Sequence, residues 1–81
     1  AMNDLDKLRV MLPHWIEHNS GHGREFEEWA QTLAASGEPD IAGLLNKAAV
    51  SLRDAESNLL QALEKAGGPL KMHGGHSHSP E

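Results

Sequence analysis

The chain has 81 residues, a formal net charge of −5 and no cysteine. A single domain of this size buries only about 60 % of the surface it exposes when unfolded, so we expect a metal or oligomerisation to add stability. The lack of thiols excludes zinc–thiolate, iron–sulfur and disulfide chemistry. The acidic balance gives no electrostatic footprint for nucleic acid or for an anionic membrane surface.

We expect neither a membrane span nor a targeting segment. No apolar run approaches the roughly 18–20 residues that a span requires, and the opening AMNDLDKLRV lacks the apolar core of a signal peptide. We therefore expect a cytoplasmic protein with no membrane or nucleic-acid partner.

Periodicity predicts a first helix over about residues 4–35. Asn3 is placed to cap its N-terminus, with an acid, Asp6, three residues later. Apolar positions step alternately by three and four residues, as in a heptad seam. The seam comprises Leu5, Leu8, Leu12, Trp15, Asn19, His22, Phe26, Trp29 and Leu33. Its polar members are Asn19 and His22, and a buried polar seam residue can specify helix register.

Pro13 falls inside this first segment. It removes a hydrogen bond to the carbonyl of Arg9 and costs about 3 kcal/mol unless the helix kinks. Either a short helix precedes Pro13 and a new one begins there, or one long helix bends at this point. The heptad continues in phase across Pro13, which favours the bent helix. Gly21 and Gly23 weaken the same region by roughly 1 kcal/mol each relative to alanine.

A second helix is predicted over about residues 39–66. Gly37 is suited to end the first helix, Pro39 suits the first turn of the second, and Gly67 with Gly68 stops it. Its narrower seam comprises Ile41, Leu45, Ala48, Leu52, Ala55, Leu59, Ala62 and Ala66. Two long helices joined by a short loop run antiparallel, so the fold class is all-α, a helical hairpin over residues 1–66.

A lone hairpin leaves Trp15, Phe26 and Trp29 awkwardly exposed. We therefore expect a homodimer, either a coiled coil or a four-helix bundle, in which the first helix supplies most of the subunit contact. Residues 67–81 form a separate tail rich in glycine and histidine.

The stretch HWIEHNSGH at 14–22 places His14, His18 and His22 four residues apart. Residues at this spacing share a helix face, so neighbouring pairs can chelate one metal ion. Joining all three on one ion is harder, since His14 and His22 are about 12 Å apart along a straight helix. Local distortion, or histidines from a second subunit near a two-fold axis, would relieve this. The alternative is three ordinary surface histidines.

Imidazole without thiolate suits nickel, zinc and copper alike. Glu17 or Glu25 is placed to orient a ligand or complete the shell, although glutamates on a helix more often form a solvated face. Metal binding requires neutral imidazole, so acidification below roughly pH 6 should release the ion.

The tail ends in MHGGHSHSPE, with His73, His76 and His78 among glycines and serines. This composition is too poor in apolar residues to pack, and interspersed histidines of this kind bind metal loosely. We interpret them as secondary metal ligands that capture ions for the helical site or buffer them. An expression tag is the alternative, although tags are usually unbroken histidine runs.

The order histidine, aromatic, two residues, histidine, three residues, histidine is matched by His14, Trp15, His18 and His22. It resembles the nickel-binding motif of CooJ-type proteins, the nickel chaperones associated with carbon monoxide dehydrogenase maturation. That family is also similar in being small, helical, coiled-coil and homodimeric, with a histidine-rich C-terminal region. The resemblance implies that the three histidines bind Ni(II) and that Trp15 packs beside them.

We therefore predict a nickel-binding metallochaperone that delivers Ni(II) to a client such as carbon monoxide dehydrogenase, with no catalysis of its own. No nucleophile arrangement, phosphate loop or paired acid and base is evident. The alternatives are a helical adaptor or dimerisation module with structural histidines, and a protein that binds Zn(II) or Cu(II).

Overall fold

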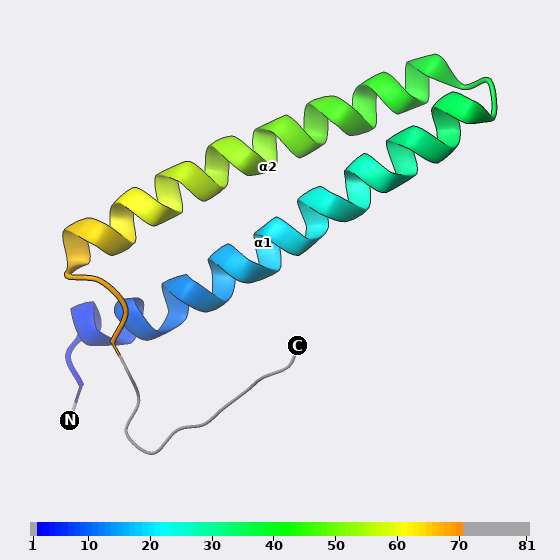
Figure 1. Cartoon of the computed structure of the whole chain (residues 1–81). Coiled ribbons are helices and arrows are strands. Elements are labelled where there is room, and N and C mark those ends of the chain that lie inside the picture. The colour runs from blue at the N-terminus through cyan, green and yellow to red at the C-terminus, as the bar shows by residue number, and fades with distance from the viewer. Residues whose placement is uncertain (1, 71–81) are drawn as a thin grey trace.

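The computed structural model describes residues 2–70, which form two helices packed side by side (Figure 1). Helix α1 spans Asp4–Ala35 and helix α2 spans Pro39–Ala66. The short loop at 36–38 makes them antiparallel, so the predicted all-α helical hairpin is confirmed. No strand occurs among the described residues. The predicted tail ligands His73, His76 and His78 lie outside them.

Local sequence signals set the helix ends. The Asn3 side-chain oxygen accepts a hydrogen bond from the backbone N–H of Asp6 at 2.8 Å, which satisfies one free donor of the first turn. A glycine in the left-handed conformation follows each helix: Gly37 after α1 has a φ of 84°, and Gly67 after α2 has a φ of 116°. At both ends the next N–H bonds the carbonyl five residues earlier, at 2.9 Å. These are Schellman ends, in which glycine takes the left-handed conformation without a Cβ penalty.

Small residues form the centre of the seam between the helices. The buried residues are Leu12, Gly23 and Ala30 of α1 and Ala42, Ala49 and Leu63 of α2. The half-buried Ile16, Asn19, Phe26 and Leu33 complete the α1 side of the seam, which again steps by three and four residues. Glycine and alanine let the two backbones approach closely, so the helices meet along this line.

Part of the predicted seam does not face the other helix. Trp15 is 43% exposed, Trp29 is 61% exposed and Ile41 is 46% exposed. Leu5, Leu8, His22 and Ala62 are exposed as well. The exposure of Trp15 and Trp29 is what a lone hairpin was expected to leave, while other members of the predicted seams, such as Leu12 and Asn19, are buried or half-buried. His22 is therefore not a buried polar residue of this contact.

The two sides of the seam differ in chemistry. On one side, which we call the polar flank, Arg53 of α2 pairs with Glu27 of α1. Antiparallel helices are related by a two-fold axis normal to the hairpin, so equivalent rows lie on the same side. The exposed apolar residues that border the seam opposite this ion pair therefore share the other side of the hairpin, which we call the apolar flank. Its exposed apolar members are Leu8, Met11, Trp15, Trp29, Ile41 and Leu44.

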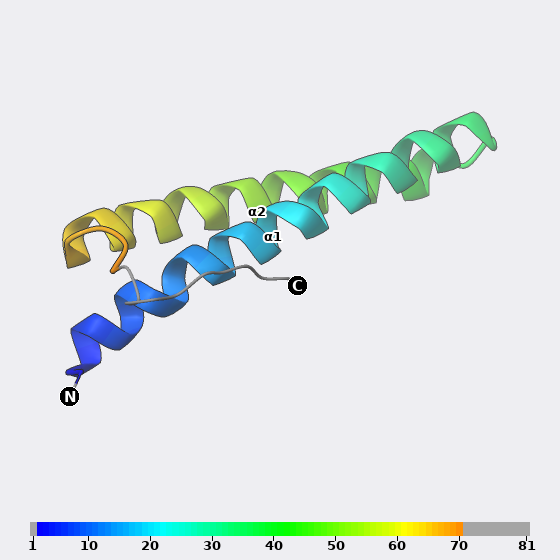
Figure 2. The same cartoon turned by 60° about the horizontal axis from the view of Figure 1, so that its bottom comes forward.

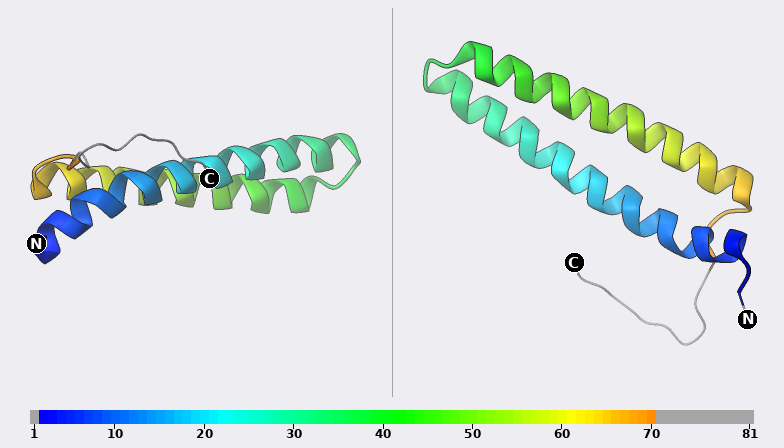
Figure 3. Two further views of the ribbon diagram at one scale, coloured as in Figure 1. Left: turned by 90° about the horizontal axis from the view of Figure 1, so that it is seen from below. Right: turned by 180° about the vertical axis from the view of Figure 1, so that it is seen from behind.

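Pro13 lies within α1 without ending it. Since Pro13 has no N–H, the carbonyl of Arg9 loses its helical partner. The backbone N–H of Leu70 donates to this carbonyl at 3.4 Å, so a residue shortly after the end of α2 supplies the missing donor. The first turns of α1 diverge from α2 (Figures 2 and 3), as expected for a helix bent at proline.

Replacing Pro13 by alanine tests this account. Alanine at position 13 restores the helical bond to the Arg9 carbonyl, so we expect the free energy of unfolding to rise by up to about 3 kcal/mol. The Leu70 amide then loses its acceptor. Thermal unfolding measures the first effect, and faster hydrogen exchange at Leu70 measures the second. Unchanged protection of that amide would contradict the pairing.

Candidate metal centre

The three histidines of 14–22 lie on successive turns of α1, and all are exposed. Four residues turn a helix slightly more than once, so the row winds gradually around it. It starts at His14 on the outer side of α1 and reaches the apolar flank at His22. Phe26 continues the row, with its ring 6.3 Å from that of His22 between centroids and nearly parallel to it.

His18 and His22 form a close pair. Their Nε2 atoms are 3.0 Å apart, and their rings meet edge to face with centroids 4.5 Å apart. Two imidazole nitrogens that bind one ion at right angles, each about 2.1 Å from it, lie about 3.0 Å apart. The observed separation therefore suits two adjacent positions in the shell of a single ion.

The Glu25 carboxylate lies beside the His22 ring. Its Oε1 lies 3.1 Å from Nδ1 of His22, so this nitrogen donates and carries the proton. Nε2 of His22 then accepts a hydrogen bond from Nε2–H of His18, and an ion bound by both nitrogens would replace that proton. A carboxylate that holds the other ring nitrogen is the usual outer partner of a metal-binding histidine. The contact places Glu25 beside the ring nitrogen of His22 that faces away from His18.

His14 stands apart from this pair. Its ring stacks on that of His18 with centroids 6.5 Å apart, too far for the two to share an ion in this arrangement. Within residues 2–70, no three His, Cys, Asp or Glu side chains gather closely enough to hold one ion. The structure therefore brings together two of the three predicted ligands.

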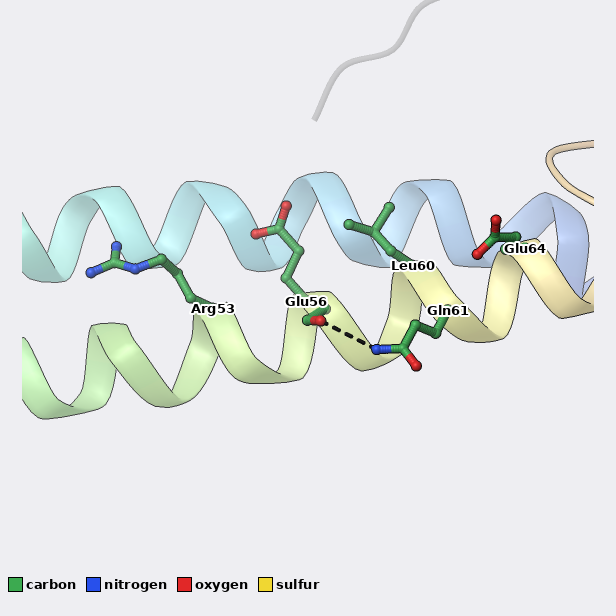
Figure 4. A pocket seen from close by; sticks show the side chains of 6 residues that line it. Arg53, Glu56, Leu60, Gln61 and Glu64 are labelled. Atoms are coloured by element: carbon green, nitrogen blue, oxygen red, sulfur yellow. Dashed lines mark hydrogen bonds between the residues drawn. The ribbon is translucent and has the colours of Figure 1, made fainter.

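Glu17 lies on the polar flank, away from the histidine pair. There it lines a shallow groove with Pro13, Arg24 and Leu60. Figure 4 shows the α2 wall of this flank, where Glu56 and Leu60 project beside α1 and Gln61 bonds Ser57. Among residues 2–70, no hydrogen bond or ion pair joins the Glu17 carboxylate to His18 or His22.

Two contributions near the pair were missed in the sequence. Phe26 was assigned only to packing, yet its ring stacks on His22. Asn19 donates its side-chain N–H to the Leu52 carbonyl at 2.8 Å, which ties the histidine segment to α2. The polar character of Asn19 in an apolar seam was the available signal for the second contact.

The fold and the site together define a helical hairpin with an exposed histidine pair on α1. The chain belongs to the family described as "Domain of unknown function (DUF8180)", whose model matches residues 8–66. The match covers the histidine row and stops where α2 ends, before the tail. An uncharacterized protein of Archaeoglobus fulgidus is 36% identical over 63 residues, which cover 78% of this chain and all of that protein. No solved structure matches. Within residues 2–70, neither helix is long and apolar enough to cross a membrane.

The two glutamates provide a matched comparison. If Glu25 orients His22 as a ligand, Glu25→Gln should weaken Ni(II) binding about tenfold, because outer partners of ligating histidines contribute on that scale. Glu17→Gln removes the same charge on the other flank and should leave affinity unchanged. Isothermal titration of both variants measures this. Equal losses would show that net charge, and not the contact to His22, matters.

Proposed function

We propose that this protein binds Ni(II) reversibly and delivers it to a client metalloenzyme, as a cytoplasmic metallochaperone without catalytic activity. The observation that carries the proposal is the pair of Nε2 atoms of His18 and His22, 3.0 Å apart, with Nδ1 of His22 held by Glu25. Both rings are exposed, so an ion has free access to them and to the remaining coordination positions.

The choice of nickel rests on the resemblance to CooJ-type proteins. Imidazoles alone also suit Zn(II) and Cu(II), which are expected to bind in vitro. The motif at His14, Trp15, His18 and His22 is similar to the nickel motif of that family, so Ni(II) is the proposed cargo. The same resemblance makes carbon monoxide dehydrogenase the proposed client.

A homodimer is part of the proposal. The apolar flank exposes Trp15, Trp29, Ile41 and Leu44, the last at 66%. Burying such side chains against a second copy would stabilise a small domain by roughly 25 cal/mol for each Å² of apolar surface removed from water. His18 and His22 lie at this flank, so a two-fold axis through it would bring the pairs of two chains close together.

The apolar flank also favours a second candidate function, a helical adaptor whose histidines serve packing. An exposed apolar patch of this kind marks an interaction surface for a protein partner. In that case the partner covers the flank and the metal is incidental. The two candidate functions therefore predict different results when the histidines are replaced.

Replacing His18 and His22 by alanine should abolish tight Ni(II) binding and leave the dimer intact. Each single replacement destroys the chelate, whereas His14→Ala should cost less because His14 stands apart from the pair. Calorimetric titration with Ni(II), Zn(II) and Cu(II) gives the affinities, and Trp15 fluorescence reports binding beside the site. Unchanged Ni(II) affinity in His18→Ala/His22→Ala would refute the proposal and favour the adaptor.

The dimer has its own matched pair of variants. Trp29 on the apolar flank is 61% exposed and Leu60 on the polar flank is 48% exposed, so neither supports the hairpin strongly. A charge buried at an interface is costly. Trp29→Glu should therefore shift sedimentation at tens of micromolar towards a monomer, while Leu60→Glu leaves the dimer unchanged. A parent protein that sediments as a monomer at that concentration would contradict the proposed dimer.

A further inference from the structure

A shallow groove of about 420 Å³ runs between the two helices on the polar flank. Its apolar floor is made by Pro13 and Ile16 of α1 and by Leu60 and Leu63 of α2. Leu63 is buried, whereas Leu60 is 48% exposed, so one large apolar side chain stands open to solvent in this groove. None of the three histidines of α1 lines it. The proposed metal site therefore leaves this surface unused.

Carboxylates border the apolar floor. Glu56 and Glu64 lie four residues before and four residues after Leu60 on α2, so the three side chains share one face of the helix (Figure 4). Glu17 borders the floor from α1. Among residues 2–70, no ion pair or side-chain hydrogen bond involves these three carboxylates. Their charges are therefore available to a partner.

The arginines of the polar flank do not cancel this charge. Arg53 is already paired with Glu27, and Arg24 donates to the Ser20 hydroxyl at 3.1 Å. Three carboxylates and the one guanidinium of Arg24 leave the groove with a net charge of −2. A two-fold contact with a second copy would set this charge against itself, and nucleic acid or an anionic membrane would be repelled. The groove is complementary to a partner that is apolar at one point and basic around it.

We propose that this groove docks a helical segment of a protein partner that presents one leucine-sized apolar side chain, with a lysine or arginine four residues before it and another four residues after it. The apolar side chain packs on Leu60 and Leu63, and the basic groups pair with Glu56 and Glu64. Eight residues span about 12 Å along any helix, so the two basic groups match the spacing of the two carboxylates. An amphipathic helix laid in a groove is a common mode of peptide recognition. The inference goes beyond the proposed function, because the histidine pair lies at the other flank.

Synthetic peptides test the inference on the full chain. The first is an alanine-based peptide of about 15 residues, long enough to form a helix, with leucine at its centre and lysine four residues to either side. A second peptide carries glutamate in place of both lysines, and a third carries alanine in place of the leucine. Fluorescence anisotropy of the labelled peptides measures their affinities. The lysine–leucine peptide should bind, and each of the other two should bind at least about tenfold more weakly.

Variants of the groove locate the binding site. Leu60→Ala removes the apolar contact and should weaken binding of the lysine–leucine peptide about tenfold, with little effect on the alanine peptide. Glu56→Gln/Glu64→Gln removes both charge pairs and should weaken binding about fivefold, by less at high salt. Glu28→Gln/Asp54→Asn is the matched control, because both carboxylates are exposed and lie outside the groove. It should bind as the parent does, and circular dichroism checks that each variant stays helical.

Three results would overturn the inference. The first is no binding of the lysine–leucine peptide. The second is an equal loss in Glu28→Gln/Asp54→Asn and Glu56→Gln/Glu64→Gln, since binding then follows net charge alone. The third is a loss in Trp29→Glu with full affinity in Leu60→Ala, which would place the peptide on the apolar flank.

Two further measurements separate this groove from the other surfaces. If Leu60→Glu converted a dimeric parent to a monomer in sedimentation, a second copy would occupy the groove and the inference would fall. His18→Ala/His22→Ala should bind the lysine–leucine peptide as the parent does, and a loss there would place the peptide at the histidines. Its Ni(II) affinity, measured by calorimetry, tests the proposed function separately.

Discussion

The close approach of α1 and α2 through small residues is the constraint on which the rest of the structure depends. Gly23 and Ala30 of α1 are buried, as are Ala42 and Ala49 of α2. Helices that meet at such residues come close only along one line, so the rotation of each about its axis is fixed. That rotation turns His18 and His22 out towards the apolar flank. A seam through Trp15 and His22 would have buried one ligand of the pair against α2.

The helices and their pairing were predictable because their signals are local. The Asn3 cap, the left-handed glycines and the short loop each act within a few residues, and together they require an antiparallel hairpin. The seam row was less predictable. Three rows of α1 are rich in apolar residues, and a hydrophobic ranking favours Trp15 and Trp29 over Gly23 and Ala30. Close approach of the two backbones instead favours Gly23 and Ala30. This approach depends on both helices and cannot be derived from α1 alone.

The same division between local and tertiary causes applies to the site. The spacing of four predicted that neighbouring histidines share a face, which is a property of any helix. It did not distinguish His14 with His18 from His18 with His22. That choice depends on ring orientation, and Glu25 and Phe26 of the next turn both lie against the His22 ring. Glu17 and Glu25 looked equivalent in sequence, yet within residues 2–70 only the Glu25 carboxylate is hydrogen-bonded to a histidine.

The geometry of the pair bears on how a bound ion would leave. A structural metal site surrounds its ion with protein ligands, whereas an open position admits an exchanging one. The side chains of His22 and Glu25 are 48% and 65% exposed, so a ligand from another molecule can approach before either imidazole departs. Transfer can then proceed by stepwise ligand exchange, without opening the hairpin. His18 and His22 lie on one helix and Asn19 ties that segment to α2, so the fold itself holds the two rings together. In the proposed delivery, a client would therefore compete for coordination positions at the surface of α1.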